Sequence, residues 1–270
     1  MSMLCETGYA KINLALHVRK RRDDGYHELE TLFAFVDAGD VLTAEPADDL
    51  TLDIVGPFAD GLTPGSENLV MRAASALQTH GKGAHLILHK NLPIASGIGG
   101  GSADAAAALR LLSRLWAVDT DLLPIAASLG ADVPACLYSE TIWGEGVGDK
   151  LSPFDADGIS GIPVLLVNPN IACPTGPIFA IWDGIDRGAL DPRSWMDGRN
   201  DLQAPAVRLF PKIAEVLSVL EMQPEVRLIR MSGSGATCFA LFETMAHRDQ
   251  ACASISNAYP SWWTLKAALR

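Results

Sequence analysis

The stretch PIASGIGGGSADAA, from Pro93 to Ala106, is the strongest local signal in the sequence. Four glycines and small neighbours leave the backbone N–H groups of this loop uncovered. A strand predicted at His85–His89 leads into the loop, and an apolar face that runs from Ala105 to Trp116 predicts a helix after it. Free amides at the start of a helix bind anions, because the helix dipole is positive there. The pattern therefore favours a polyphosphate site over an inert turn.

Three common nucleotide-binding patterns are absent from the sequence. No G-x-x-x-x-G-K-[ST] loop occurs, and Ser102 interrupts the glycine spacing of a dinucleotide fingerprint. His247-Arg248-Asp249 resembles a protein-kinase catalytic loop, but Ser254 stands where that loop needs asparagine and no DFG occurs. The HRD triplet is interpreted as the solvated start of a helix.

Composition limits the class of protein. The chain has 270 residues, of which 49% are apolar and 20% charged, which allows two modest domains or one large one. The net charge of −11 argues against a general nucleic-acid binder, because phosphate backbones need a basic surface. A small anionic ligand needs only one locally positive pocket and is not excluded.

The cysteines and the apolar segments favour a cytoplasmic protein. Five cysteines occur far apart without a C-x-x-C pair, so neither a disulfide framework nor a zinc site is expected. No signal peptide is apparent at the N-terminus. The uncharged segment Gly158–Trp182 is interrupted by four prolines, so we expect a strand at Pro163–Val167 followed by a loop and no membrane span.

The order of the expected elements is α+β in both halves of the chain. Strands are predicted at Ala10–Val18, Glu28–Val36, Val41–Ala44, Val226–Met231, Thr237–Phe242 and Trp263–Ala267. Helices are predicted at Asn68–Gln78, Leu122–Leu129, Ala206–Leu220 and His247–Asn257. Pro, Asp and Gly concentrate at Ser152–Gly161, which indicates one domain over residues 1–155 and a second over residues 156–270.

Three blocks in order resemble the GHMP kinases. These are AKINLALHV (Ala10–Val18) with DGYHELETLF (Asp24–Phe33), then the glycine loop, and then MSGSGATCFALF (Met231–Phe242). GHMP kinases phosphorylate small alcohols and carboxylates and lack a Walker A loop. The resemblance implies an N-terminal domain like ribosomal protein S5 and a ferredoxin-like C-terminal domain.

Further blocks resemble one branch of that superfamily, the 4-diphosphocytidyl-2-C-methyl-D-erythritol kinase family of the non-mevalonate isoprenoid route. They are DGYHELET, GADVPACL, GEGVGDKL, PTGPIF and NDL. The resemblance as a whole covers nearly the whole chain. The resemblance implies ATP-dependent phosphorylation of the 2-hydroxyl of a small cytidine diphosphate substrate. Ala95 and Ser96 depart from the pattern, because glycine is frequent at these positions in the family.

The resemblance assigns the catalytic roles to two residues. Asp132, in GADVP, would accept the proton of the substrate hydroxyl or orient that hydroxyl. Lys11 would keep this carboxylate ionised and stabilise charge on the transferred group. Taken alone, Asp132 fits a turn and Lys11 fits a solvated strand; the flanking motifs favour the catalytic roles.

The resemblance also assigns two sets of binding residues. Substrate would be bound by Asn13, Tyr26, His27, Thr175, Phe179, Gly233, Ser234 and Gly235, with the cytosine base between aromatic rings. ATP would be bound by Asn68, Lys90, Pro93, Ala95, Ser96, Gly97, Gly99, Gly100, Gly101, Ser102 and Ala103. Mg²⁺ would be held mainly by phosphate oxygens and water, so no protein metal ligand is assigned.

Three alternatives stay open at this point. A GHMP kinase for mevalonate or homoserine would not need the tyrosine–histidine pair or Phe179. A decarboxylase with this fold would release CO₂ from a diphosphorylated hydroxy acid. A non-catalytic nucleotide sensor would not need Lys11 and Asp132. Neither the oligomeric state nor a nucleic-acid or membrane partner is indicated by the sequence.

Overall fold

The computed structural model describes residues 3–77 and 82–270. The chain forms two compact units that interleave along the sequence. Unit 1 comprises Met1–Ala10, Ala38–Ile94 and Gly99–Ser139, and unit 2 comprises Lys11–Asp37, Ala95–Ile98 and Glu140–Arg270. The domain boundary expected at residue 155 remains a prediction. The long strands β1 (Leu4–Arg21) and β2 (His27–Ala47) contribute residues to both units.

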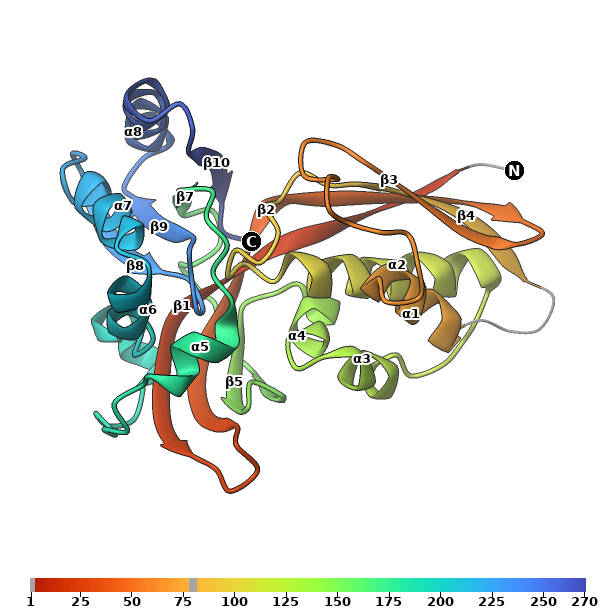
Figure 1. The fold of residues 1–270 in the computed structure, drawn as a ribbon, viewed down its shortest axis with the longest axis horizontal. Coiled ribbons are helices and arrows are strands. Elements are labelled where there is room, and N and C mark those ends of the chain that lie inside the picture. Colours follow the sequence, from red (N-terminus) through yellow and green to blue (C-terminus); the bar gives the residue numbers. More distant parts are fainter. Residues whose placement is uncertain (1–2, 78–81) are drawn as a thin grey trace. The chain divides into compact units, whose positions relative to one another are not determined.

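Unit 1 combines part of a sheet with a group of helices (Figure 1). Strand β4 (Gly83–His89) pairs in parallel with β3 (Leu50–Val55) and antiparallel with the second half of β2. The helices are α1 (Leu69–Leu77), α2 (Gly100–Trp116), α3 (Leu123–Leu129) and α4 (Val133–Tyr138), and they contact one another. An unbroken run of buried alanines, residues 105–108 of α2, allows close approach of its neighbours.

Unit 2 contains an antiparallel sheet in the order β10-β7-β9-β8. Its strands are β7 (Pro163–Asn168), β8 (Val226–Met231), β9 (Cys238–Phe242) and β10 (Trp263–Ala268). Helix α7 (Lys212–Glu221) contacts β8 and β9, and α8 (Met245–Ala258) contacts β7 and β10 (Figure 1). This βαββαβ order confirms the predicted ferredoxin-like half. The HRD triplet lies near the start of α8, as predicted, but its three residues are half-buried rather than solvated.

Unit 2 also contains the second half of β1, the first half of β2 and several shorter elements. Strand β5 (Ile142–Gly146) pairs with Leu29–Phe33 of β2 and with β6 (Lys150–Pro153). Helices α5 (Thr175–Ala180) and α6 (Gln203–Leu209) and the 3₁₀ segment Pro192–Asp197 precede α7.

Several boundaries differ from the sequence-based predictions. The helix predicted at Ala206–Leu220 is two helices, because Pro211, which has no backbone N–H, stands between α6 and α7. The segment predicted as a loop after β7 contains α5. Strands β3, β5 and β6 and helix α4 are short and were not predicted. Gln78, the predicted end of the first helix, lies outside the described residues.

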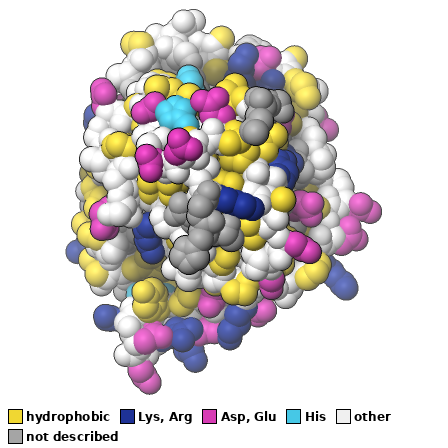
Figure 2. Space-filling view, turned by 90° about the vertical axis from the view of Figure 1, so that its right-hand side faces the viewer, with side chains coloured by type: hydrophobic (Ala, Val, Ile, Leu, Met, Phe, Trp, Pro, Cys, Tyr) yellow, Lys and Arg dark blue, Asp and Glu magenta, His cyan; other side chains and the backbone are white. Residues whose placement is uncertain are grey.

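Three further observations concern the surface, the cysteines and the helices. On the face shown in Figure 2, acidic and basic side chains are interspersed with apolar ones. All five cysteines are free thiols. Among the described residues, no helix has the length and apolar character needed to cross a membrane.

Candidate functional site

The glycine loop has the backbone conformations that its sequence predicts. Gly97 and Gly99 have positive φ values of 77° and 65°, and Ala95 also has a positive φ, of 50°. Helix α2 begins directly afterwards at Gly100, and the N–H of Ala103 donates to the carbonyl of Gly99 at 2.8 Å. A 17-residue helix thus starts at the end of the loop, which fits the expected binding of phosphate oxygens.

The part of the loop in unit 2 is supported by the turn Ser232–Gly235. A Cβ atom on Gly97 would lie 2.6 Å from the carbonyl oxygens of Ser232 and Gly235, so no other residue fits there without movement. The hydroxyl of Ser232 donates to the carbonyl of Gly97 at 2.9 Å, and the N–H of Thr237 donates to the carbonyl of Ser96 at 3.1 Å. The third sequence block is therefore in direct contact with the glycine loop.

Asn200 binds the backbone of the same segment. Its buried side-chain amide donates to the carbonyls of Met231 and Gly233, both at 2.7 Å. The hydroxyls of Ser234 and Thr175, both predicted substrate contacts, lie 2.9 Å apart. Asn200 belongs to the NDL block, but the sequence alone did not assign it a role.

Lys11 and Asn13 lie together in the buried part of β1. The ammonium group of Lys11 donates to Oδ1 of Asn13 at 3.1 Å and lies 5.1 Å from the ring centroid of Phe33. The Asn13 backbone N–H donates to the hydroxyl of Ser232 at 3.2 Å. Lys11 is only 4% exposed, so it does not have the solvated position that is usual for a strand lysine.

His27 is the centre of an aromatic cluster. Its ring centroid lies 4.9 Å from that of Phe179 and 5.5 Å from that of Trp182, which meets it edge-on. Burial, together with the nearby charge of Arg21, lowers the pKa of His27. The imidazole is therefore neutral at neutral pH and offers one donor and one acceptor nitrogen. The phenol-bearing side chain of Tyr26 is 65% exposed.

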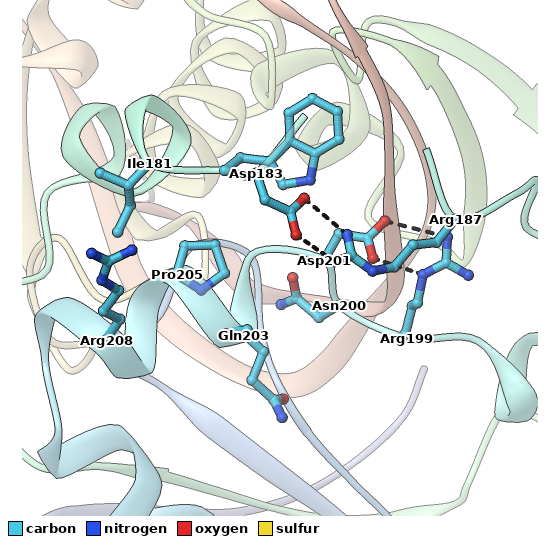
Figure 3. A pocket seen from close by; sticks show the side chains of 11 residues that line it. Ile181, Asp183, Arg187, Arg199, Asn200, Asp201, Gln203, Pro205 and Arg208 are labelled. Carbon is cyan, nitrogen blue, oxygen red and sulfur yellow. Dashed lines mark hydrogen bonds and ion pairs between the residues drawn. The ribbon is translucent and has the colours of Figure 1, made fainter. Parts of the chain in front are cut away.

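A pocket of about 390 Å³ lies beside this cluster in unit 2 (Figure 3). Trp182 and Asn200 contribute to its lining, together with two ion pairs, Arg187 with Asp183 and Arg199 with Asp201. None of the predicted site residues lines it. Trp182 was not recognised from the sequence, although its position three residues after Phe179 is the spacing of one helical turn.

In unit 1, Lys90 is a member of a buried ionic group. Its ammonium donates to Oδ2 of Asp104 at 2.7 Å and to Oδ2 of Asp40. The other oxygen of Asp40 accepts the backbone N–H groups of Asn91 and Leu92 at 2.6 and 2.8 Å. The group lies next to the start of α2, since a Cβ atom on Gly100 would lie 3.2 Å from the Lys90 ammonium. Adenine binding by Lys90 remains a prediction.

The two carboxylates of this group differ in their surroundings. Oδ1 of Asp104 is buried without a hydrogen-bond partner. Burial raises the pKa of Asp104 to about 8, against the opposing charge of Lys90 and with the support of Asp40. Burial alone would lower the pKa of Lys90, but the charges of Asp104 and Asp40 outweigh it and raise that pKa. We infer that Asp104 keeps its proton at pH values at which a solvent-exposed aspartate has lost it.

This titration predicts a measurable pH dependence of stability. Between about pH 4 and pH 8, folded Asp104 keeps a proton that the unfolded chain has released, so its contribution to stability falls as pH rises. Asp104→Asn removes this titrating carboxyl group. The free energy of unfolding of the variant, relative to that of the unchanged protein, should therefore rise with pH across this window. Urea unfolding at several pH values measures the difference. A difference that stays constant from pH 4 to 8 would contradict the assignment.

Three other predicted residues of unit 1 lie at or near the starts of helices. The side-chain oxygen of Asn68 accepts the N–H of Val70 at 3.0 Å at the start of α1, and its NH₂ donates to the carbonyl of Thr63 at 3.1 Å. Asp132 is half-buried directly before α4, and its side chain makes no capping hydrogen bond to that helix. Ser102 lies in the first turn of α2.

Metal-ligating side chains do not gather in the described part of the chain. Within residues 3–77 and 82–270, no group of three or more His, Cys, Asp or Glu side chains has the arrangement to hold a metal ion.

Comparison with known proteins places this geometry in a family. The model of the GHMP kinases N terminal domain matches residues 68–140, and that of the GHMP kinases C terminal region matches residues 185–261. The chain is 53% identical to 4-diphosphocytidyl-2-C-methyl-D-erythritol kinase of Rhizorhabdus wittichii, over 98% of this chain and 94% of that protein. It is 54% identical to the same kinase of Novosphingobium aromaticivorans, over 99% and 93%.

The chain belongs to this family of GHMP kinases.

Solved structures of GHMP kinases agree with this assignment. A crystal structure of 4-(cytidine 5'-diphospho)-2C-methyl-D-erythritol kinase superposes with a TM-score of 0.84 at 34% identity, covering 98% of this chain and 99% of that one. A homoserine kinase from Cytophaga hutchinsonii gives a TM-score of 0.69 at 15% identity, covering 100% and 95%, which shows a shared fold alone. The predicted GHMP kinase fold is confirmed.

Proposed function

We propose that this chain transfers the γ-phosphate of ATP to the 2-hydroxyl of 4-diphosphocytidyl-2-C-methyl-D-erythritol, a step of the non-mevalonate route to isoprenoid precursors. The main support is the identity of more than half of the residues with kinases named for that substrate, over nearly the full length of both chains. The cytoplasmic location expected from the sequence remains a prediction.

The aromatic cluster supports the cytidine part of the proposal. A base needs a flat apolar contact and a polar group that reads its edge. Phe179 provides a ring at 4.9 Å from the His27 ring, and the lowered pKa of His27 keeps the imidazole neutral. A neutral imidazole donates from one nitrogen and accepts at the other, which suits the mixed donor and acceptor edge of cytosine.

The roles proposed for phosphate transfer are those that the resemblance to the family implies for three residues. Asp132 acts as the base or orients the acceptor hydroxyl. Lys11 stabilises the charge of the transferred group, and Asn13, which accepts its hydrogen bond, contacts the substrate near the acceptor. ATP is bound through the glycine loop and the first turn of α2, and Mg²⁺ supplies charge neutralisation on the phosphate oxygens.

A substrate panel tests the proposal. The purified protein is incubated with ATP, Mg²⁺ and one acceptor at a time: the cytidine diphosphate alcohol, mevalonate, homoserine or a diphosphorylated hydroxy acid. We expect one added phosphate, measured by product mass, on the cytidine compound alone. Phosphorylation of mevalonate or homoserine instead, or release of CO₂, would assign a different activity of the same fold.

Phe179→Ala tests the cytidine contact directly. Loss of base stacking costs about 1–3 kcal/mol, so we expect KM for the cytidine substrate to rise by roughly tenfold to a hundredfold. KM for ATP should change little. Phe210→Ala is the matched control, since both rings are partly buried against the same core of unit 2. If KM for ATP rises instead, or if CMP fails to compete with the substrate, the assignment of this cluster to cytidine is wrong.

A further inference from the structure

Asn13 is held at both ends of its side-chain amide. Its Oδ1 accepts from the ammonium of Lys11 at 3.1 Å, and its Nδ2 donates to the hydroxyl of Thr31 at 2.8 Å. Asn13 is 2% exposed and Thr31 is 1% exposed, so water does not compete for these atoms. Lys11 and Asn13 are two residues apart on β1, which places both side chains on one face of the strand.

Thr31 and Phe33 have the same spacing on β2. The Lys11 ammonium lies over the Phe33 ring, and the Asn13 amide meets Thr31, so the two strands contribute two facing pairs. On β5, Gly144 pairs with Thr31, and a Cβ atom there would lie 2.7 Å from the Phe33 ring and 3.2 Å from the Thr31 methyl group. The glycine therefore leaves the space in which Thr31 and Phe33 pack.

The hydroxyl of Thr31 determines which way the Asn13 amide is turned. It donates its single hydrogen to the carbonyl of Ala15 at 2.7 Å, so toward Asn13 it can only accept. Asn13 must direct its NH₂ to Thr31, and this leaves its oxygen for Lys11, which only donates. Thr31 and Lys11 therefore require the same orientation of the Asn13 amide. The hydrogen bonds form one chain of donors, from Lys11 to Asn13, from Asn13 to Thr31, and from Thr31 to the carbonyl of Ala15.

We propose that Thr31 is a positioning residue that acts through Asn13 on the ammonium group of Lys11. The inference rests on the proposed function, in which Lys11 stabilises charge on the transferred phosphoryl group. Without the hydroxyl, the buried NH₂ of Asn13 loses its acceptor, and the amide turns toward another one. Its oxygen then no longer holds Lys11 in place. Thr31 does not need to touch either substrate for this effect.

Thr31→Val tests the proposal, because valine replaces the hydroxyl with a methyl group of similar size. We expect kcat to fall by about tenfold to a hundredfold, the scale of a misplacement of about 1 Å. KM for ATP should stay within about twofold, since the glycine loop is untouched. Thr31→Ser restores the hydroxyl without the methyl group and should recover most of kcat. Thr31→Ala, which also lacks the hydroxyl but adds no bulk, replaces the valine variant if valine prevents folding.

A double-mutant cycle separates positioning from a purely structural effect. If Thr31 acts through Lys11, Thr31→Val should cost little in a Lys11→Gln background, because the group that it positions is gone. Circular dichroism and the melting temperature confirm folding of each variant. Unchanged kcat in Thr31→Val, equal losses in both backgrounds, or a serine variant as slow as the valine variant would each overturn the proposal.

Failure of the proposed function gives a different result. The cycle is measured with whichever alcohol the unchanged protein phosphorylates in the substrate panel. A different preferred alcohol would therefore overturn the substrate assignment, whereas the dependence of kcat on Thr31 would still report on Lys11.

Discussion

Asp132→Asn should lower kcat by about 10²–10⁴, the range over which a positioned general base contributes to a rate. Asparagine has nearly the same shape as aspartate, but its amide does not accept a proton from the acceptor hydroxyl. KM for both substrates should change much less than kcat, because the carboxylate acts on the reacting proton. Steady-state kinetics with the cytidine substrate and ATP give the two parameters separately.

The variant should keep its fold. Asp132 precedes α4, but its side chain makes no capping hydrogen bond to that helix, so asparagine removes no helix cap. Asp119→Asn is the matched control, since it makes the same charge change at an exposed position of unit 1 and should not alter kcat. A folded Asp132→Asn protein with nearly unchanged turnover would remove Asp132 from the mechanism.

Gly97→Ala should lower kcat/KM for ATP by about 10², because the loop must move by about 1 Å to accept the new methyl group. Gly97 has a φ of 77°, a conformation that costs alanine roughly 1–2 kcal/mol. The methyl group would also lie 2.6 Å from the carbonyl oxygens of Ser232 and Gly235. Relief of this clash separates the loop from the Ser232 hydroxyl that binds the Gly97 carbonyl.

The variant should lose mainly affinity for ATP. Isothermal calorimetry with a non-hydrolysable ATP analogue should show weaker binding, and kinetics should show a raised KM for ATP. Gly65→Ala is the control, since a Cβ atom there meets no atom within 4 Å and the backbone does not need a positive φ. Unchanged ATP affinity in a folded Gly97→Ala protein would show that this contact does not shape the phosphate loop.

The sequence by itself determined the class of fold and the position of the glycine loop before α2. Both depend on local patterns: the glycines from Gly97 to Gly101 before a strongly periodic helix, and runs of apolar residues that form buried strands such as β7. Local patterns were weaker for short elements. Strands β5 and β6 have too few residues for a period to stand out, and Pro211 lay inside a helix that otherwise looked continuous.

The roles of single polar residues needed the tertiary structure. Five residues look like ordinary polar residues in the sequence, and no sequence pattern indicates a role for them: Thr31, Asp40, Asp104, Asn200 and Ser232. In the fold they are buried, and their hydrogen bonds reach partners as distant in sequence as Asn13 from Ser232. Periodicity reports which face of an element is apolar. It does not report which buried polar groups meet across the chain, because those partners are set by strand register and packing, and burial makes each unpaired group costly.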